Sequence, residues 1–147
     1  MLRTSLRPAL TAASLTVSLL IGATAFAATE SYVADLKASS EVPPNDAKGA
    51  GTVTATYDTA SKKLTYTATY TGLTGAATAA HFHGPAAAGA NAPPVVPVPP
   101  TALASPIKGE ATLTDAQAAD LQGGKWYFNV HTAAHGGGEL RGQVTKK

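Results

Sequence analysis

The amino-acid sequence predicts an all-β domain, an antiparallel β-sandwich or Greek-key barrel with one short helix. Short segments alternate between apolar and polar side chains, which is typical of strands that bury one face. Turn residues separate these segments, and we count about seven of them. Only the segment 115–121 has the pattern of a helix, so strands and helices do not alternate as they do in parallel α/β folds.

Residues 1–27 are expected to be a secretory signal peptide. Two arginines precede a mostly apolar stretch, 10–21, and the small residues Ala25 and Ala27 form a cleavage site. A membrane anchor is the alternative, but this stretch is rich in Thr, Ser and Ala, whereas a span needs about 20 apolar residues. We therefore expect cleavage after Ala27, a single domain over 28–147 without a membrane span, and a periplasmic or extracellular location.

The charge balance argues against nucleic-acid binding, and the lack of cysteine restricts the ligands of any metal site. The chain has eleven Lys and Arg, nine Asp and Glu, and no cysteine. Removing Arg3 and Arg7 with the signal leaves nine basic residues, which equals the nine acidic residues. A balanced chain without a basic face is not expected to bind nucleic acid. Without thiolates, a metal site needs imidazole, carboxylate or carbonyl ligands.

The first half of the domain is predicted to form four strands. Alternation predicts a strand over 32–38 and then a hairpin of 51–58 and 64–71, both rich in threonine and tyrosine. A short strand around His81 follows. The segment 85–106 is rich in proline and has no charged residue. An edge strand at Val95 and Val96 is the alternative, but Pro94 and Pro97 bracket this pair tightly. We interpret the segment as a long surface loop with polyproline character.

The second half is predicted to form a strand, a helix and two further strands. A strand over 107–113 precedes the helix 115–121, for which Thr114 and Gln117 form a capping box. The glycine pair 123–124 ends this helix. The next strand, 125–132, is expected to place Trp126, Phe128 and Val130 in the core and Tyr127, Asn129 and His131 on the other face.

The last predicted strand is 139–144, with Leu140 and Val144 pointing inward. Glu139 and Arg141 share its other face. They are interpreted either as a surface ion pair or as an anchor in which Arg141 holds the turn that bears His131 and His135. We favour a structural role for both.

Five motifs follow one another along the chain: Ser40-Glu41-Val42-Pro43-Pro44, AHFHGPA from Ala80, Leu113-Thr114 with Gln117 and Leu121, YFNVHT from Tyr127, and GELRGQV from Gly138. In these motifs, and over nearly the whole mature chain, the sequence resembles the CHRD domain, a module named after chordin and common in exported bacterial proteins. The resemblance implies an immunoglobulin-like or barrel-like β fold. It implies little about activity, and the growth-factor antagonism of chordin is not carried over to a single-domain exported protein.

The departures from the family pattern are small. Phe82 and Leu140 stand where isoleucine is more usual, Gly136 stands where proline is frequent, and the proline-rich loop is long.

Three of the four histidines of the chain lie in two of these motifs, and His135 follows three residues after the end of the second. His81 and His83 are two residues apart on a strand and so share a face. If the strand of His131 is their neighbour, three imidazoles converge, with His135 in the following turn as a candidate fourth ligand. Such a site fits Cu²⁺ or Zn²⁺, and the affinity order favours copper over zinc. Glu41 and Glu139 are the candidate carboxylates that bind the metal or orient a ring.

Two functions remain open. The first is an exported protein that binds a transition metal through the histidines. The second is a non-enzymatic extracytoplasmic module that contacts a protein or an envelope polymer and whose histidines form a hydrogen-bonded structural cluster.

A histidine pair on a barrel strand is also similar to copper-zinc superoxide dismutase, but the sequence has no separate ligand cluster for a second metal. It also has no Ser-His-Asp order or carboxylate pair typical of a hydrolase. We therefore expect a binding protein rather than an enzyme.

Overall fold

The computed structural model describes residues 28–147, and the predicted signal peptide, 1–27, lies outside the described residues. Within 28–147, no helix combines the length and the apolar character needed to cross a membrane.

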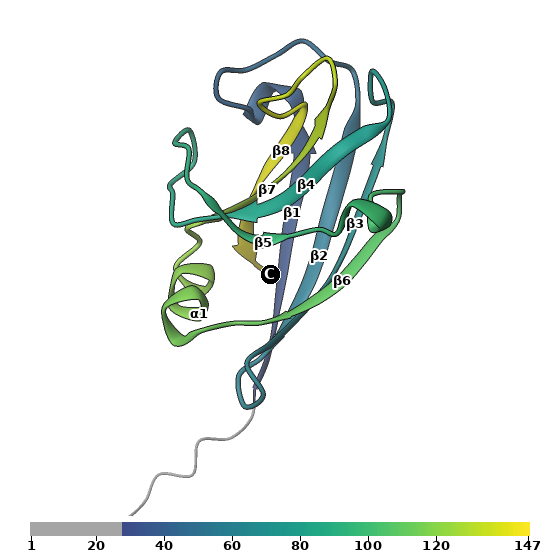
Figure 1. The fold of residues 1–147 in the computed structure, drawn as a ribbon. Coiled ribbons are helices and arrows are strands. Elements are labelled where there is room, and N and C mark those ends of the chain that lie inside the picture. Colours follow the sequence, from purple (N-terminus) through teal and green to yellow (C-terminus); the bar gives the residue numbers. More distant parts are fainter. Residues whose placement is uncertain (1–27) are drawn as a thin grey trace, which may run out of the picture.

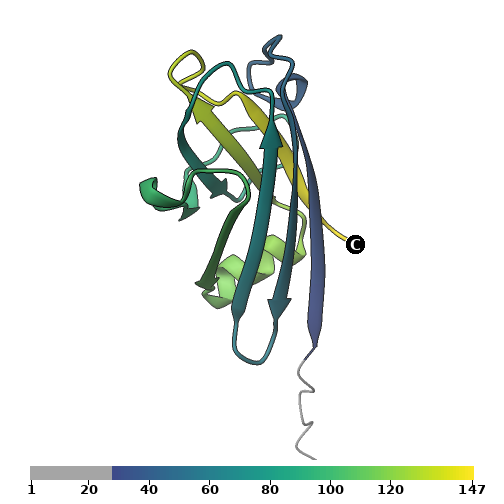
Figure 2. The same ribbon diagram turned by 90° about the vertical axis from the view of Figure 1, so that its right-hand side faces the viewer.

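Eight strands form one antiparallel sheet in the order β5-β4-β7-β8-β1-β2-β3-β6. The sheet curls into a nearly closed barrel, with the helix α1 beside one end (Figures 1 and 2). The prediction of an all-β antiparallel fold with one short helix is therefore confirmed. The strands are β1 (Thr29–Lys37), β2 (Ala50–Asp58), β3 (Lys63–Thr71), β4 (Ala77–His83), β5 (Pro94–Pro97), β6 (Ile107–Thr112), β7 (Trp126–Thr132) and β8 (Leu140–Lys146). The helices are α1 (Asp115–Gln122) and two 3₁₀ turns, η1 (Ala38–Ser40) and η2 (Pro100–Ala102).

Alternation along the strands gives the curled sheet an apolar inside. In β2, for example, Val53, Ala55 and Tyr57 are buried, while the three threonines that alternate with them, 52, 54 and 56, are exposed. Those threonines lie opposite threonines of β3 in three successive cross-strand pairs. The hairpin predicted from the alternating pattern is confirmed.

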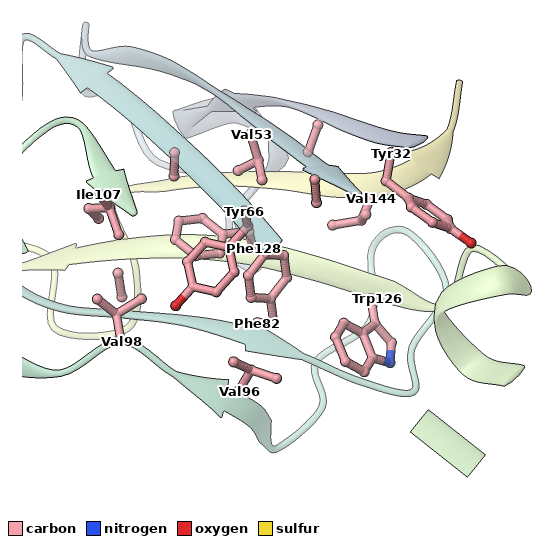
Figure 3. Packing of buried hydrophobic residues seen from close by; sticks show 14 of the residues in the cluster. Tyr32, Val53, Tyr66, Phe82, Val96, Val98, Ile107, Trp126, Phe128 and Val144 are labelled. Atoms are coloured by element: carbon pink, nitrogen blue, oxygen red, sulfur yellow. The ribbon is translucent and has the colours of Figure 1, made fainter. Parts of the chain in front are cut away.

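Phe82 lies at the centre of the core (Figure 3). Its ring centroid is 4.9 Å from that of Tyr66, 4.8 Å from that of Phe128 and 5.9 Å from that of Trp126. Because neighbouring side chains on a strand point to opposite faces, burying Phe82 directs His81 and His83 to the outer face of β4.

The interpretation of 85–106 as a loop without a strand is wrong at its middle. Residues Pro94–Pro97 form the edge strand β5, in which Val96 pairs with Phe82 and is buried. Proline is tolerated on an edge strand because one side of the strand needs no backbone donor. The burial of Val96 and Val98 against the core supplies the stabilisation that the local sequence does not show.

The helix α1 begins as predicted. Gln117 N–H donates to the Thr114 hydroxyl at 3.2 Å, and Thr114 N–H donates to the Gln117 side chain at 2.9 Å, which completes the capping box. Ala118 and Leu121 are buried, so the helix packs on the domain rather than standing alone.

Candidate metal centre

The site begins with the pairing of β4 and β7, which are neighbours in the sheet. His81 lies opposite Asn129, and Ala79 lies opposite His131, so the His131 ring is diagonal to that of His81. The ring centroid of His81 is 5.1 Å from that of His131 and 5.3 Å from that of His83. The convergence of three imidazoles predicted from the sequence is therefore present in the structure.

Two backbone carbonyls fix which nitrogen of two rings carries the proton. His83 Nδ1 lies 2.8 Å from the carbonyl oxygen of Ala92, and His131 Nδ1 lies 3.1 Å from that of Gly136. A carbonyl only accepts hydrogen bonds, so each Nδ1 must be protonated and donate. In a neutral ring, Nε2 then keeps a free lone pair, which is the form that binds a metal.

Each of the three converging histidine rings has one buried nitrogen without a hydrogen-bond partner. His81 Nδ1, His83 Nε2 and His131 Nε2 are buried and have no hydrogen-bond partner. One nitrogen from each ring lies within 4.8 Å of the others. Copper and zinc bind imidazole nitrogen at about 2.0–2.1 Å, so three rings that are this close together can share one ion.

Burial keeps these rings neutral. It lowers the pKa of His81, and the nearby charges that His131 and His83 would carry lower it further. Burial is also the main cause of the lowered pKa of His83 and of His131, although the hydrogen bonds to Ala92 and Gly136 act in the opposite direction. Neutral imidazoles with free lone pairs do not have to lose a proton before they bind a cation.

His135 lies outside this group of three. It is half-buried in the turn that follows β7, where its backbone N–H donates to the carbonyl of Thr132 at 3.2 Å. Its role as a fourth ligand stays a prediction.

Glu41 is a buried carboxylate close enough to Asn129 and Arg141 for both to act on its pKa. Its side chain is 4% exposed, and its Oε1 has no hydrogen-bond partner. Burial raises the pKa of Glu41 to about 7, against the opposing charge of Arg141 and contacts with Val42 and Asn129. Glu41 is not one of the three converging groups, so the structure places it beside the site.

Glu139 and Arg141 do not form the surface ion pair considered from the sequence, because both are buried. Glu139 accepts hydrogen bonds from the hydroxyls of Thr74, at 2.7 Å, and Thr132, and from the N–H of Thr74 at 2.8 Å. Burial alone would raise the pKa of Glu139, but these donors lower it below its usual range. Glu139, rather than Arg141, therefore fixes the turn after β7.

Arg141 contacts a different segment from the one proposed. Its guanidinium donates to the Asn91 side chain at 2.8 Å and to the carbonyl of Ala90 at 2.5 Å. The anchor predicted for the turn of His131 and His135 instead holds the loop between β4 and β5.

The model of the CHRD domain family matches residues 32–144. The chain belongs to the CHRD domain family. No curated protein and no solved structure matches it. In this CHRD domain His81, His83 and His131 lie on one outer face, over β4 and β7, and the family match covers both of these strands.

The groups that the sequence did not reveal are the carbonyls of Ala92 and Gly136. They set the proton positions of two rings, but a backbone carbonyl is present at every residue and leaves no signal in the sequence. Asn91, which binds Arg141, was missed for a different reason: its partner is 50 residues away in the chain.

Proposed function

We propose that this CHRD domain binds one transition-metal ion through His81, His83 and His131. One observation carries the proposal: three histidine rings, each with a buried nitrogen that has no partner, converge from two neighbouring strands. A buried polar atom without a partner costs about 1–3 kcal/mol. A metal ion that accepts all three lone pairs removes this cost.

Copper is the metal that the ligand chemistry favours. Imidazole binds both copper and zinc, and the affinity order of divalent ions places Cu²⁺ above Zn²⁺. Three protein ligands leave a coordination position for water or another small ligand, as in sites that exchange or present their metal rather than lock it into the fold. We therefore propose metal handling as the role.

The experiment is a titration of residues 28–147 with Cu²⁺ and, separately, Zn²⁺, followed by calorimetry and thermal melting. We expect one ion per chain and a raised melting temperature, because an ion at 100 times its Kd stabilises the folded state by about 2.7 kcal/mol. His81→Ala and His131→Ala should each abolish stoichiometric binding while circular dichroism shows an intact fold. Unchanged metal binding in His135→Ala would indicate a site of three histidines, and weakened binding would indicate a site of four.

Unchanged binding in both His81→Ala and His131→Ala would refute the proposal. If metal leaves the melting temperature unchanged and His81→Ala destabilises the domain with or without metal, the histidines are structural. The alternative of an interaction module that contacts a protein or an envelope polymer would then take its place.

We further propose that the chain is exported and acts in the periplasm or outside the cell. The support is the sequence of 1–27, in which basic residues precede an apolar stretch and small residues form a cleavage site. Cleavage after Ala27 would also leave β1 intact, because this strand begins at Thr29. Mass spectrometry of the protein from an expressing cell tests this. A mature N-terminus at Ala28 in the exported fraction is expected, and an uncleaved chain in the cytoplasm would refute it.

A further inference from the structure

The segment 86–93, which we term the covering loop, lies over the outer face of the sheet beside His83. It is tied at both ends by backbone hydrogen bonds: Ala86 N–H donates to the carbonyl of Lys125 at 2.8 Å, and Gly84 N–H donates to that of Pro93 at 3.2 Å. Between these ends, the carbonyl of Ala92 accepts the hydrogen bond from His83 Nδ1. The position of the covering loop therefore decides whether His83 has its Nδ1 partner.

Two side chains of β8 reach the covering loop. Gln143 donates to the carbonyl of Ala86 at its start, at 2.9 Å, and Arg141 binds its middle. Arg141 is 2% exposed, and its two terminal nitrogens donate to Asn91 Oδ1 and to the carbonyl of Ala90. Asn91 in turn donates from Nδ2 to the carbonyl of Val42 at 3.2 Å. A planar guanidinium with two fixed bonds holds a loop in one place more strictly than a lysine does.

Tyr127 lies between Arg141 and His83. The Arg141 guanidinium carbon is 3.4 Å from the centre of the Tyr127 ring. The Tyr127 ring also stacks on the His83 ring. Their centroids are 4.7 Å apart, and their planes differ by 3°. The Tyr127 hydroxyl accepts from the N–H of Ala92 and donates to its carbonyl, at 3.2 Å in both cases. Tyr127 thus fixes both the plane of the His83 ring and the residue that binds its Nδ1.

We propose that Arg141 is a positioning residue for the metal site, acting through Tyr127 and the covering loop to keep the proton of His83 on Nδ1 and the Nε2 lone pair free. This inference rests on the proposed function, because the Nε2 lone pair matters only if a metal binds there. Residues that orient a metal ligand in this way typically contribute 10–100-fold to metal affinity.

Two variants test the role of Arg141. Arg141→Lys keeps the charge but loses the paired hydrogen bonds that the guanidinium donates to Asn91 and Ala90. Asn91→Ala removes one acceptor of Arg141 at an exposed position of the covering loop, so it keeps the test valid if Arg141→Lys does not fold. The first readout is the tautomer of each histidine in the metal-free protein, from long-range ¹⁵N–¹H NMR correlations. The second is the Kd for Cu²⁺.

In the wild type we expect both His83 and His131 to carry the proton on Nδ1. In either variant, His83 should shift toward the Nε2–H form, His131 should stay unchanged because Gly136 holds it, and the Kd should rise by about tenfold or more. Asn45→Ala, which removes an asparagine tied to the carbonyls of Gly138 and Glu139 instead, should leave the His83 tautomer unchanged.

A folded variant that keeps His83 in the Nδ1–H form and binds Cu²⁺ within twofold of the wild type would overturn the inference and leave the proposed function standing. If the wild type does not bind Cu²⁺, the proposed function fails. The tautomers then still decide whether Arg141 and the covering loop position His83.

Discussion

Gly138 lies directly against the carboxylate of Glu41. The backbone at Gly138 has a φ of +130°, and a Cβ at this position would collide with both oxygens of Glu41. The neighbouring Asn45 donates from Nδ2 to the carbonyls of Gly138 and Glu139, at 3.3 Å and 3.1 Å. The turn after β7 and the segment after η1 therefore pack against each other, at the same end of the barrel (Figure 1).

Gly138→Ala should destabilise the domain. The backbone conformation at this position is essentially restricted to glycine and costs about 1–3 kcal/mol for other residues, to which the collision with Glu41 adds. Urea denaturation of Gly138→Ala should show this loss. Gly136→Ala is the matched control in the same turn, because a Cβ there meets no neighbour and its φ is not positive. Equal stability of the two variants would contradict the packing described.

Glu41→Gln should change how stability depends on pH. Since burial raises the pKa of Glu41 from 4.5 to about 7 in the folded state, the folded chain binds more protons than the unfolded chain between these values. The contribution of Glu41 to stability therefore falls as pH rises from 4.5 to 7 and stays constant above 7. Relative to wild type, Glu41→Gln should gain up to about 3 kcal/mol over this window.

Denaturation of the wild type and Glu41→Gln at several pH values between 4.5 and 8 measures this difference. Comparing the two proteins cancels the opposite contribution of the histidines, whose lowered pKa values make stability fall as pH decreases below 6.5. A constant difference across the window would show that Glu41 ionises as it does in water.

Copper affinity should change little with pH above about 6.5. Burial lowers the pKa of each of the three rings below the usual 6.5, so the rings are mostly neutral there and release few protons on binding. Below that range the affinity should fall as protons compete for the same nitrogens. Calorimetry at pH 7.5, 6.5 and 5.5 in buffers of different ionisation enthalpy tests both statements. A tenfold loss of affinity between pH 7.5 and 6.5 would contradict them.

Phe82→Ala should destabilise the domain by about 3–5 kcal/mol, because it leaves a cavity among Tyr66, Phe128 and Trp126. The same change removes the packing that directs His81 and His83 outward, so copper affinity should fall as well. Thr54→Ala, on the exposed face of β2, serves as the control and should stay within about 0.5 kcal/mol of wild type. A loss below 1 kcal/mol for Phe82→Ala would place Phe82 outside the core.

The sequence predicts most of this fold because the alternation of apolar and polar residues is a local signal. The strands from β1 to β4, the capping box of α1 and the core face of β7 all follow from it. β5 could not be found in this way, since its stability comes from the pairing of Val96 with Phe82 and from burial against distant strands. The local prolines indicate a loop.

The candidate site is predictable only in part. The shared face of His81 and His83 follows from their spacing, whereas the approach of His131 depends on which strand pairs with β4. The burial of Glu139 and Arg141 was missed because charged residues are usually exposed and their partners are far away in the chain. Thr74 lies 65 residues from Glu139, and Ala90 lies 51 residues from Arg141.

The most direct measurement is pulsed EPR of residues 28–147 loaded with one equivalent of Cu²⁺, which counts the imidazoles bound to copper through the couplings of their remote nitrogens. The account predicts couplings from His81, His83 and His131, with one set lost in each of the three single alanine variants. A spectrum with at most one imidazole, or one that is the same in wild type and His131→Ala, would contradict the metal centre.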